Sequence, residues 1–247
     1  MRNHPEVQVI ETAYGPLDRA ASLNRRMARG GALLRATLDV RWDDPGAVQV
    51  LTGVEAALVA FSPSFRWHQC RGPHAYHVFA RDRPPVPVAA GGHTDGQGSR
   101  DMPFDAGLAL AHLIEHAVID FESAITHERR ISGVTGARLR PPGRYDVMVE
   151  CPEPAVGRLC LAMAIVSLTG AADSHPPGRR EQDLLATARA TYRHPGQVWT
   201  PPGLARVLGW PIARAEDALS SLRDLGYLAP LPSTMNFSGV PCYRVAT

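Results

Sequence analysis

The segment from Asp105 to His127 predicts a helix that is apolar around most of its circumference. Asp105 can cap its first turn, because a short carboxylate accepts hydrogen bonds from the backbone N–H groups at a helix start. The apolar side chains of the interior turns are Ala109, Leu110, Leu113, Ile114, Ala117, Val118 and Ile119. A helix of this kind is stable only when other elements cover it, so the chain must fold around this segment.

Three polar side chains interrupt the apolar surface of this helix: His112, Glu115 and His116. The two histidines are four residues apart, so their imidazoles project from one face and can hold one cation. Polar groups in such surroundings need partners, and a metal ion satisfies them. The order His-x-x-Glu-His is that of the inverzincin hydrolases. It predicts Zn²⁺ bound by His112 and His116, with Glu115 as general base toward a zinc-bound water.

The third zinc ligand is predicted from the segment that follows the helix at Val48–Phe61. His68 is the first choice, because a turn there can aim it at the metal. Asp120, one turn beyond His116, is an alternative ligand or, more in keeping with its position, an acceptor that fixes the imidazole of His116. Glu150 is a more distant choice. We expect the other histidines of this region on the surface: His74, His77, His93 and His127.

Arginines cluster in the segment after the metal-binding helix, at Arg138, Arg140 and Arg144. An arginine there can clamp a substrate carboxylate through two parallel hydrogen bonds, or polarise the carbonyl of the bond to be cleaved. Arg138 is the residue that we predict in this catalytic role. A solvated basic loop is the alternative.

Strands and helices interleave over residues 1–171, which predicts an α+β or α/β domain with a mixed sheet. The predicted strands are Val7–Glu11, Ala32–Val40, Ala75–Ala80 and Tyr145–Glu150. The other predicted helices are Pro16–Ala28, Val48–Phe61 and Ala155–Leu168, with loops over residues 83–100 and 133–143. Residues 172–178 are expected to be a linker.

Residues 179–247 predict a small winged helix-turn-helix domain. Its expected elements are helices over Arg180–Tyr192, Thr200–Leu208 and Pro211–Leu225 and a hairpin within Asn236–Val245. A winged helix suggests DNA as partner, and these residues contain eight arginines against five acidic residues. The third helix, however, carries a net negative charge, which is unfavourable next to phosphates. Docking of a protein or formation of a homodimer is therefore the preferred role.

The composition removes several classes of function. The chain contains no lysine, which excludes Schiff-base chemistry and a Walker-type phosphate loop. Its four cysteines form no CxxC pair, which argues against a zinc ribbon or a disulfide framework. No uncharged apolar run is long enough to cross a membrane, and the first residues lack the apolar core of a signal peptide. We therefore expect a cytoplasmic protein without a membrane partner.

Three motifs from Val7 to Leu168 resemble the N-terminal domain of cyanophycin synthetase. They are ALAHLIEHAVID (109–120), WHQCRG (67–72), and GAR (136–138) followed by GRYDVMVE (143–150). The resemblance implies a domain that hydrolyses peptide-like bonds, with His68 on the family's motif histidine and Asp120 on its motif glutamate. The family's Gly-Met-Pro run after the helix is replaced by residues 127–133. A winged helix follows in place of the family's ATP-grasp and Mur-ligase-like domains, so we expect a free-standing relative with its own substrate.

The sequence thus supports two functions. The first is a zinc peptidase that cleaves a peptide or isopeptide bond of a peptide or protein substrate. The second is a winged-helix transcription regulator whose N-terminal domain senses a metal or another ligand without turnover. A regulatory protease that clips a repressor would join both roles.

Overall fold

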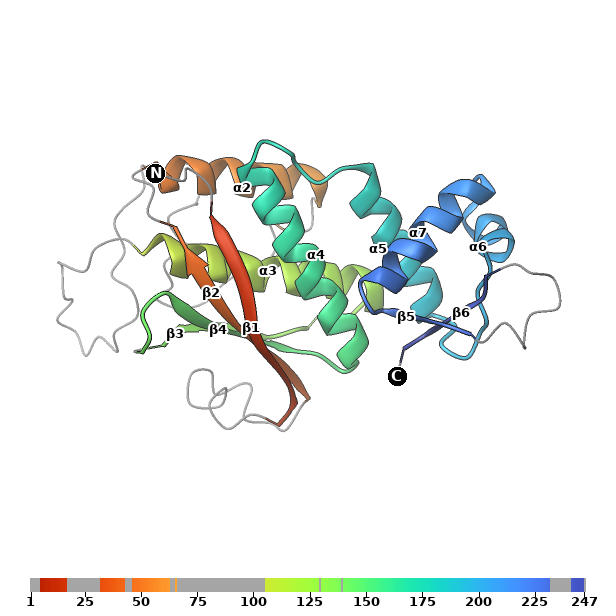
Figure 1. The fold of residues 1–247 in the computed structure, drawn as a ribbon, viewed down its shortest axis with the longest axis horizontal. Helices are drawn as coiled ribbons and strands as arrows, with labels where there is room; N and C mark the ends of the chain where they lie inside the picture. Colours follow the sequence, from red (N-terminus) through yellow and green to blue (C-terminus); the bar gives the residue numbers. More distant parts are fainter. Residues whose placement is uncertain are drawn as a thin grey trace.

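The computed structural model describes residues 5–16, 32–42, 46–62, 65, 105–128, 130–138, 140–231 and 241–246. These residues form an α+β structure with six helices, a four-stranded sheet and a two-stranded sheet. Figure 1 shows the larger sheet beside helices α2, α3 and α4, and the remaining helices with the small sheet at the opposite end of the molecule.

The four-stranded sheet has the order β1-β2-β4-β3, and each neighbouring pair is antiparallel. Its strands are β1 (Glu6–Gly15), β2 (Leu33–Arg41), β3 (Gly133–Ala137) and β4 (Arg144–Glu150). The expectation of a mixed sheet is therefore wrong for the described strands. A short turn joins β3 to β4, and a connection of that length permits only antiparallel pairing.

One face of this sheet packs against helices, and the other carries polar side chains and a small buried cluster of Leu33, Val134 and Met148. Alternation along a strand sends successive side chains to opposite faces. The residues that join the main apolar core are Leu34, Ala36, Leu38 and Val40 of β2 and Tyr145, Val147 and Val149 of β4. Arg35, Thr37 and Asp146 consequently lie on the opposite face.

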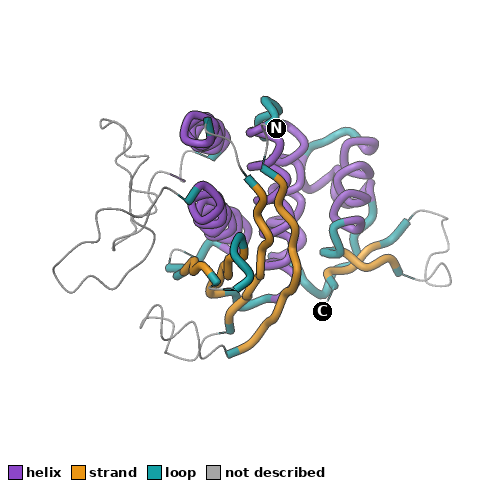
Figure 2. The backbone as a smooth tube through the Cα atoms, turned by 60° about the vertical axis from the view of Figure 1, so that its left-hand side comes forward, coloured by secondary structure: helices purple, strands orange, loops and turns teal. Residues whose placement is uncertain are grey.

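Two helices pack on the apolar face of the sheet, α3 (Ala106–Thr126) and α4 (Pro154–Ala172), and α2 (Ala47–Phe61) packs against both of them (Figure 2). α3 is central and packs against β3, β4, α2 and α4. The prediction that Asp105 caps this helix is confirmed, since its Oδ1 accepts a hydrogen bond of 2.9 Å from the Leu108 N–H. The helix ends at His127, which adopts the left-handed conformation with φ 64°.

α4 is long and apolar enough to cross a membrane by length and composition alone. More than half of its apolar window is buried within the molecule, where it packs against α3, α2 and the sheet. This burial is compatible with a core helix of a soluble protein.

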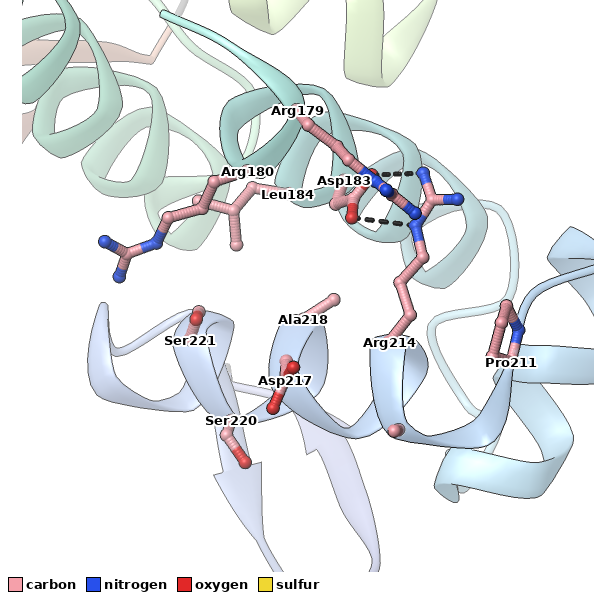
Figure 3. Close-up of a pocket in the computed structure, with 11 residues that line it drawn as sticks. Arg179, Arg180, Asp183, Leu184, Pro211, Arg214, Asp217, Ala218, Ser220 and Ser221 are labelled. Atoms are coloured by element: carbon pink, nitrogen blue, oxygen red, sulfur yellow. Dashed lines mark hydrogen bonds and ion pairs between the residues drawn. The ribbon is translucent and has the colours of Figure 1, made fainter. Parts of the chain in front are cut away.

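The C-terminal part consists of α5 (Arg179–Tyr192), α6 (Pro201–Leu208), α7 (Ile212–Asp224) and an antiparallel pair of strands, β5 (Leu228–Pro230) and β6 (Tyr243–Val245). α5 packs against α3 on one side and α7 on the other. Arg214 of α7 holds Asp183 of α5 through two hydrogen bonds of 2.5 and 2.8 Å (Figure 3). The buried apolar residues of this part belong to the same core cluster as those around α3.

Most predicted elements are confirmed to within a few residues, but three boundaries are wrong. Residues 133–143 are not all loop, because β3 occupies Gly133–Ala137. β1 continues to Gly15, since its second half pairs with β2. The C-terminal hairpin uses β5 and β6 as its arms. The predictions for Pro16–Ala28, for Ala75–Ala80 and for residues 83–100 lie outside the described residues, apart from Pro16 itself.

Candidate metal centre

α3 presents His112, Glu115 and His116 within the core of the molecule. Their side chains are nearly inaccessible, with 5, 3 and 5% of each residue exposed. A helix places residues i, i+3 and i+4 on neighbouring positions of one face, so these three side chains converge. Their ligand atoms all lie within 4.8 Å of one another, and they form the one such group among the described residues.

The two imidazoles face each other through the same ring nitrogen. Nε2 of His112 and Nε2 of His116 are 3.2 Å apart. Two nitrogens bound to one tetrahedral zinc ion at about 2.0–2.1 Å are separated by roughly 3.3 Å, the edge of that tetrahedron. A hydrogen bond between a protonated and an unprotonated ring nitrogen has a similar length. The separation of the two nitrogens is therefore compatible with a shared cation as well as with a hydrogen bond.

Glu115 lies beside this pair of nitrogens. Its Oε2 is 3.8 Å from Nε2 of His112 and accepts a hydrogen bond of 2.5 Å from the Thr135 hydroxyl. Burial raises the pKa of Glu115 to about 8, and the hydrogen bond from Thr135 acts in the opposite direction. β3 therefore fixes the orientation of this carboxylate next to the histidines.

Gly133 allows β3 to approach the carboxylate closely. A Cβ atom at this position would overlap with Oε1 of Glu115 and would also press on Ile119. Neither Gly133 nor Thr135 was predicted as part of the site, because two glycines in a five-residue stretch read as turn signals. Their pairing with β4 is a tertiary contact that no local pattern reports.

Phe65 marks where the chain after α2 reaches the site. Its ring packs edge-on against the imidazole of His116, with ring centroids 6.2 Å apart and planes at 69°. His68, the predicted third ligand, lies outside the described residues, as do His74, His77 and His93.

Asp120 and Glu150, the other candidate ligands, do not join the group of His112, Glu115 and His116. Asp120 is buried one helical turn beyond His116. Glu150 accepts a hydrogen bond of 2.8 Å from the Ser132 N–H at the end of β4. His127, expected on the surface, is exposed and contacts Arg193.

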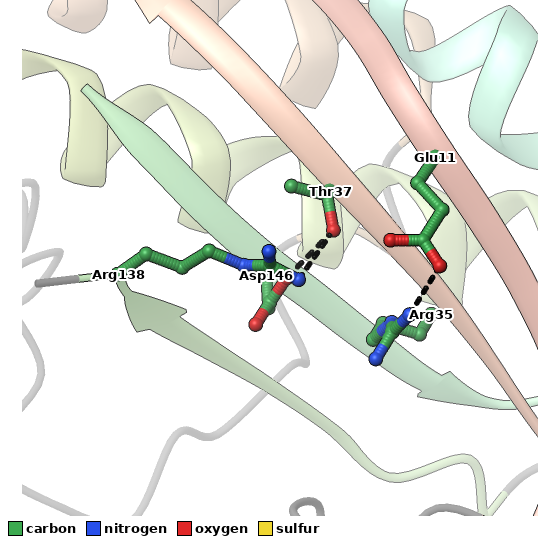
Figure 4. Close-up of polar contacts among 5 residues, drawn as sticks. All are labelled: Glu11, Arg35, Thr37, Arg138 and Asp146. Carbon is green, nitrogen blue, oxygen red and sulfur yellow. Dashed lines mark hydrogen bonds and ion pairs between the residues drawn. The ribbon is translucent and has the colours of Figure 1, made fainter. Parts of the chain in front are cut away.

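Arg138 follows β3, and its guanidinium turns to the sheet face opposite α3 (Figure 4). It donates hydrogen bonds of 2.9 Å to both Asp146 and the Thr37 hydroxyl, and Thr37 in turn donates to Asp146 at 2.8 Å. The structure therefore does not bring Arg138 together with the histidine pair.

Glu122 is a buried acid that the sequence reasoning did not single out. It is 0% exposed, on the same face of α3 as Glu115 but two turns later. Burial raises its pKa to about 8, while the neighbouring Cys151 thiol lowers it and Glu150 raises it further. Cys151 and Cys160 are buried free thiols, and burial raises the pKa of each.

A hollow of about 750 Å³ lies between α5 and α7, away from the histidine pair (Figure 3). Its charged lining is of both signs, with Arg179, Arg180 and Arg214 opposed by Asp183 and Asp217. Because Arg214 is already engaged by Asp183, little uncompensated positive charge faces this space.

No protein-family model and no curated protein matches this chain. The resemblance to the N-terminal domain of cyanophycin synthetase therefore depends on its three short motifs alone, and it stays a prediction.

Proposed function

We propose that the chain is a zinc-dependent peptidase that cleaves a peptide or isopeptide bond. The observation that carries this proposal is the pair of Nε2 atoms of His112 and His116, 3.2 Å apart in a buried site, with a Glu115 oxygen 3.8 Å from one of them. Two imidazole nitrogens at a tetrahedral edge favour zinc over the harder cations, which prefer oxygen ligands.

His68 is the third ligand in this proposal. Phe65 touches the imidazole of His116, and three residues of chain span at most about 10 Å. A chain of this length permits His68 to reach the two Nε2 atoms. The match of His68 to the motif histidine in the resemblance to cyanophycin synthetase adds independent support.

A bound zinc ion would supply Lewis acidity, polarising a carbonyl and making a water molecule more acidic. Glu115 accepts the proton of the attacking water as general base and passes it to the leaving amine. Thr135 holds the Glu115 carboxylate in place through its hydroxyl. Asp120 is buried on α3 one helical turn after His116, and in this proposal it acts as a positioning residue for the imidazole of His116.

The decisive variant is Glu115→Gln, because it removes the base and keeps both histidines. We expect it to retain zinc and to lose about 10²–10⁴-fold in peptide cleavage. Glu128→Gln is the matched control, since Glu128 is exposed just beyond the end of the same helix and should leave both readouts unchanged. The assay combines metal analysis with mass-spectrometric detection of cleaved proteome-derived peptides or cyanophycin. Unchanged cleavage by Glu115→Gln would refute this mechanism.

A second candidate function is a winged-helix regulator, and one observation favours it. Trp199, between α5 and α6, forms an isolated antiparallel bridge with Tyr243 of β6, which also pairs with β5. The resulting order of a helix, an isolated bridge residue, two helices and a hairpin supports the proposal of a winged helix-turn-helix domain.

Protein docking or a homodimer suits this domain better than DNA. α7 carries Arg214 and Arg223 but also Glu216, Asp217 and Asp224, and both arginines are paired with acidic side chains. A helix that enters a DNA groove needs a positive face. If regulation rather than cleavage is the function, Glu115→Gln should leave partner binding and cellular activity intact. Analytical ultracentrifugation tests the homodimer.

A further inference from the structure

β3 is an edge strand of the sheet next to the proposed zinc site. It pairs with β4 on one side and has no strand on its other side within the described residues (Figure 1). Thr135 of this strand holds Glu115 by a hydrogen bond of 2.5 Å. The opposite edge strand, β1, is separated from β3 by two intervening strands, or roughly 14 Å at about 4.8 Å per strand.

The hydrogen bonds between β3 and β4 fix which backbone groups point outward. The Arg138 N–H donates to the Arg144 carbonyl at 2.8 Å, and the Glu150 N–H donates to the Ser132 carbonyl at 2.8 Å. In an antiparallel pair, residues with bonds to the partner alternate with residues whose N–H and C=O point away. Thr135 and Ala137 therefore direct their backbone groups out of the sheet, and no hydrogen bond to these groups occurs within the described part of the chain.

The outward edge runs past the proposed zinc site. Gly133 lies against Glu115 and Ile119, whereas Tyr145, which pairs with Ala137, contacts Gly107. β3 thus runs antiparallel to α3. Along α3, His112 lies between Gly107 and Glu115, the two residues that mark the ends of this contact with the sheet. A chain segment paired with Thr135 and Ala137 would therefore run along β3 at the level of His112 on α3.

We propose that the β3 edge binds the substrate as an added antiparallel strand, so that the protein takes extended main-chain peptides of several residues rather than isolated isopeptide-linked dipeptides. This inference rests on the proposed zinc peptidase function. Pairing through main-chain groups is tolerant of sequence and requires consecutive peptide bonds.

The probe for this proposal is Ala137→Pro. It deletes the outward N–H donor and no bond to β4, and proline is tolerated at such an edge position. Ala137→Val keeps the donor and is the matched control. Calorimetry of the zinc-loaded protein compares acetohydroxamate, which contacts the metal alone, with the tripeptide hydroxamate Pro-Leu-Gly-NHOH.

We expect the tripeptide to bind at least about 10-fold more tightly than acetohydroxamate in wild type and in Ala137→Val. In Ala137→Pro this gain should fall below about 3-fold, with acetohydroxamate affinity unchanged. A gain that persists in Ala137→Pro, or no gain in wild type, would overturn the proposal. If the protein takes up no zinc and neither hydroxamate binds, the proposed zinc peptidase function fails instead.

A second measurement does not depend on a ligand that binds the metal. Amide hydrogen exchange of Glu115→Gln is followed with carboxymethylated insulin B chain as the peptide. The Thr135 and Ala137 amides should exchange fast alone and become protected when the peptide is added. Absence of protection overturns the proposal. Protection of these amides that rises with protein concentration in the absence of peptide also overturns the proposal, because a second copy of the chain would then occupy the β3 edge.

Discussion

Gly133 lies so close to the Glu115 carboxylate that a single methyl group would disturb the site. We expect Gly133→Ala to destabilise the fold by about 1–3 kcal/mol and to weaken zinc binding, because Glu115 or β3 must shift. Gly53→Ala is the control, since Gly53 is exposed in α2 with open space around it, and there alanine should stabilise by about 0.5–1 kcal/mol. Denaturant unfolding with metal analysis measures both. Equal behaviour of the two variants would contradict the close approach of β3.

Glu122 makes the stability of the fold depend on pH. Burial raises its pKa to about 8 from the usual 4.5, so the folded state binds its proton more tightly than the unfolded state. The free energy of unfolding should therefore fall as the pH rises from about 4.5 to 8. Glu122→Gln removes the contribution of Glu122 to this dependence and should be more stable than wild type at pH 8 by about 1–3 kcal/mol, with little difference at pH 5. Parallel pH profiles of the two proteins would show that Glu122 is not buried as described.

Arg138 and Arg35 offer a matched comparison on the same sheet face (Figure 4). Their side chains are similarly exposed, at 26 and 22%, but Asp146 beside Arg138 is 0% exposed and Glu11 beside Arg35 is 52% exposed. Arg138→Ala leaves a buried carboxylate without its cation and should destabilise by about 2–3 kcal/mol. Arg35→Ala should cost at most about 1 kcal/mol.

The same pair tests the catalytic role predicted for Arg138. If Arg138 acts on substrate, cleavage per zinc-loaded folded molecule falls by far more in Arg138→Ala than in Arg35→Ala. If its work is to hold Asp146 and Thr37, the two variants cleave alike and only their thermal unfolding differs.

At the scale of elements, sequence patterns predicted the helices, because interactions between residues close in the sequence determine where a helix forms and begins. Apolar periodicity predicted α3 and the other described helices, and Asp105 predicted where α3 begins. The spacing of His112, Glu115 and His116 predicted that these side chains share one face of α3. β3 did not follow, because Gly133 and Gly136 suppress a strand signal. Only its pairing with β4 and its contact with α3 make it a strand, and these contacts join residues far apart in the sequence.

The antiparallel pairing of the strands could likewise not be predicted from the sequence patterns. Alternating strands and helices suggested crossover connections, but α2 and α3 connect β2 to β3 across the sheet, and β4 then returns antiparallel between β2 and β3. The hydroxyl of Thr135 became part of the site for the same reason. Its role depends on the register of β3 with β4 and not on any motif.

At the scale of the whole molecule, α5 joins the two parts of the chain through its packing against α3. The buried apolar residues of both parts form one cluster, which includes Trp199 and Tyr227 near the C-terminus and Leu110 and Ile114 on α3. We expect a single cooperative unfolding transition, with circular dichroism and tryptophan fluorescence giving the same midpoint. Two separate transitions would show that residues 179–247 fold independently of the sheet.

The metal content of the purified protein tests the central claim most directly. Inductively coupled plasma mass spectrometry should find about one zinc per chain in wild type and in Glu115→Gln, and far less than one in His112→Ala and His116→Ala. A wild-type protein without a stoichiometric transition metal, or a His112→Ala variant that keeps its zinc, would contradict a metal centre on α3.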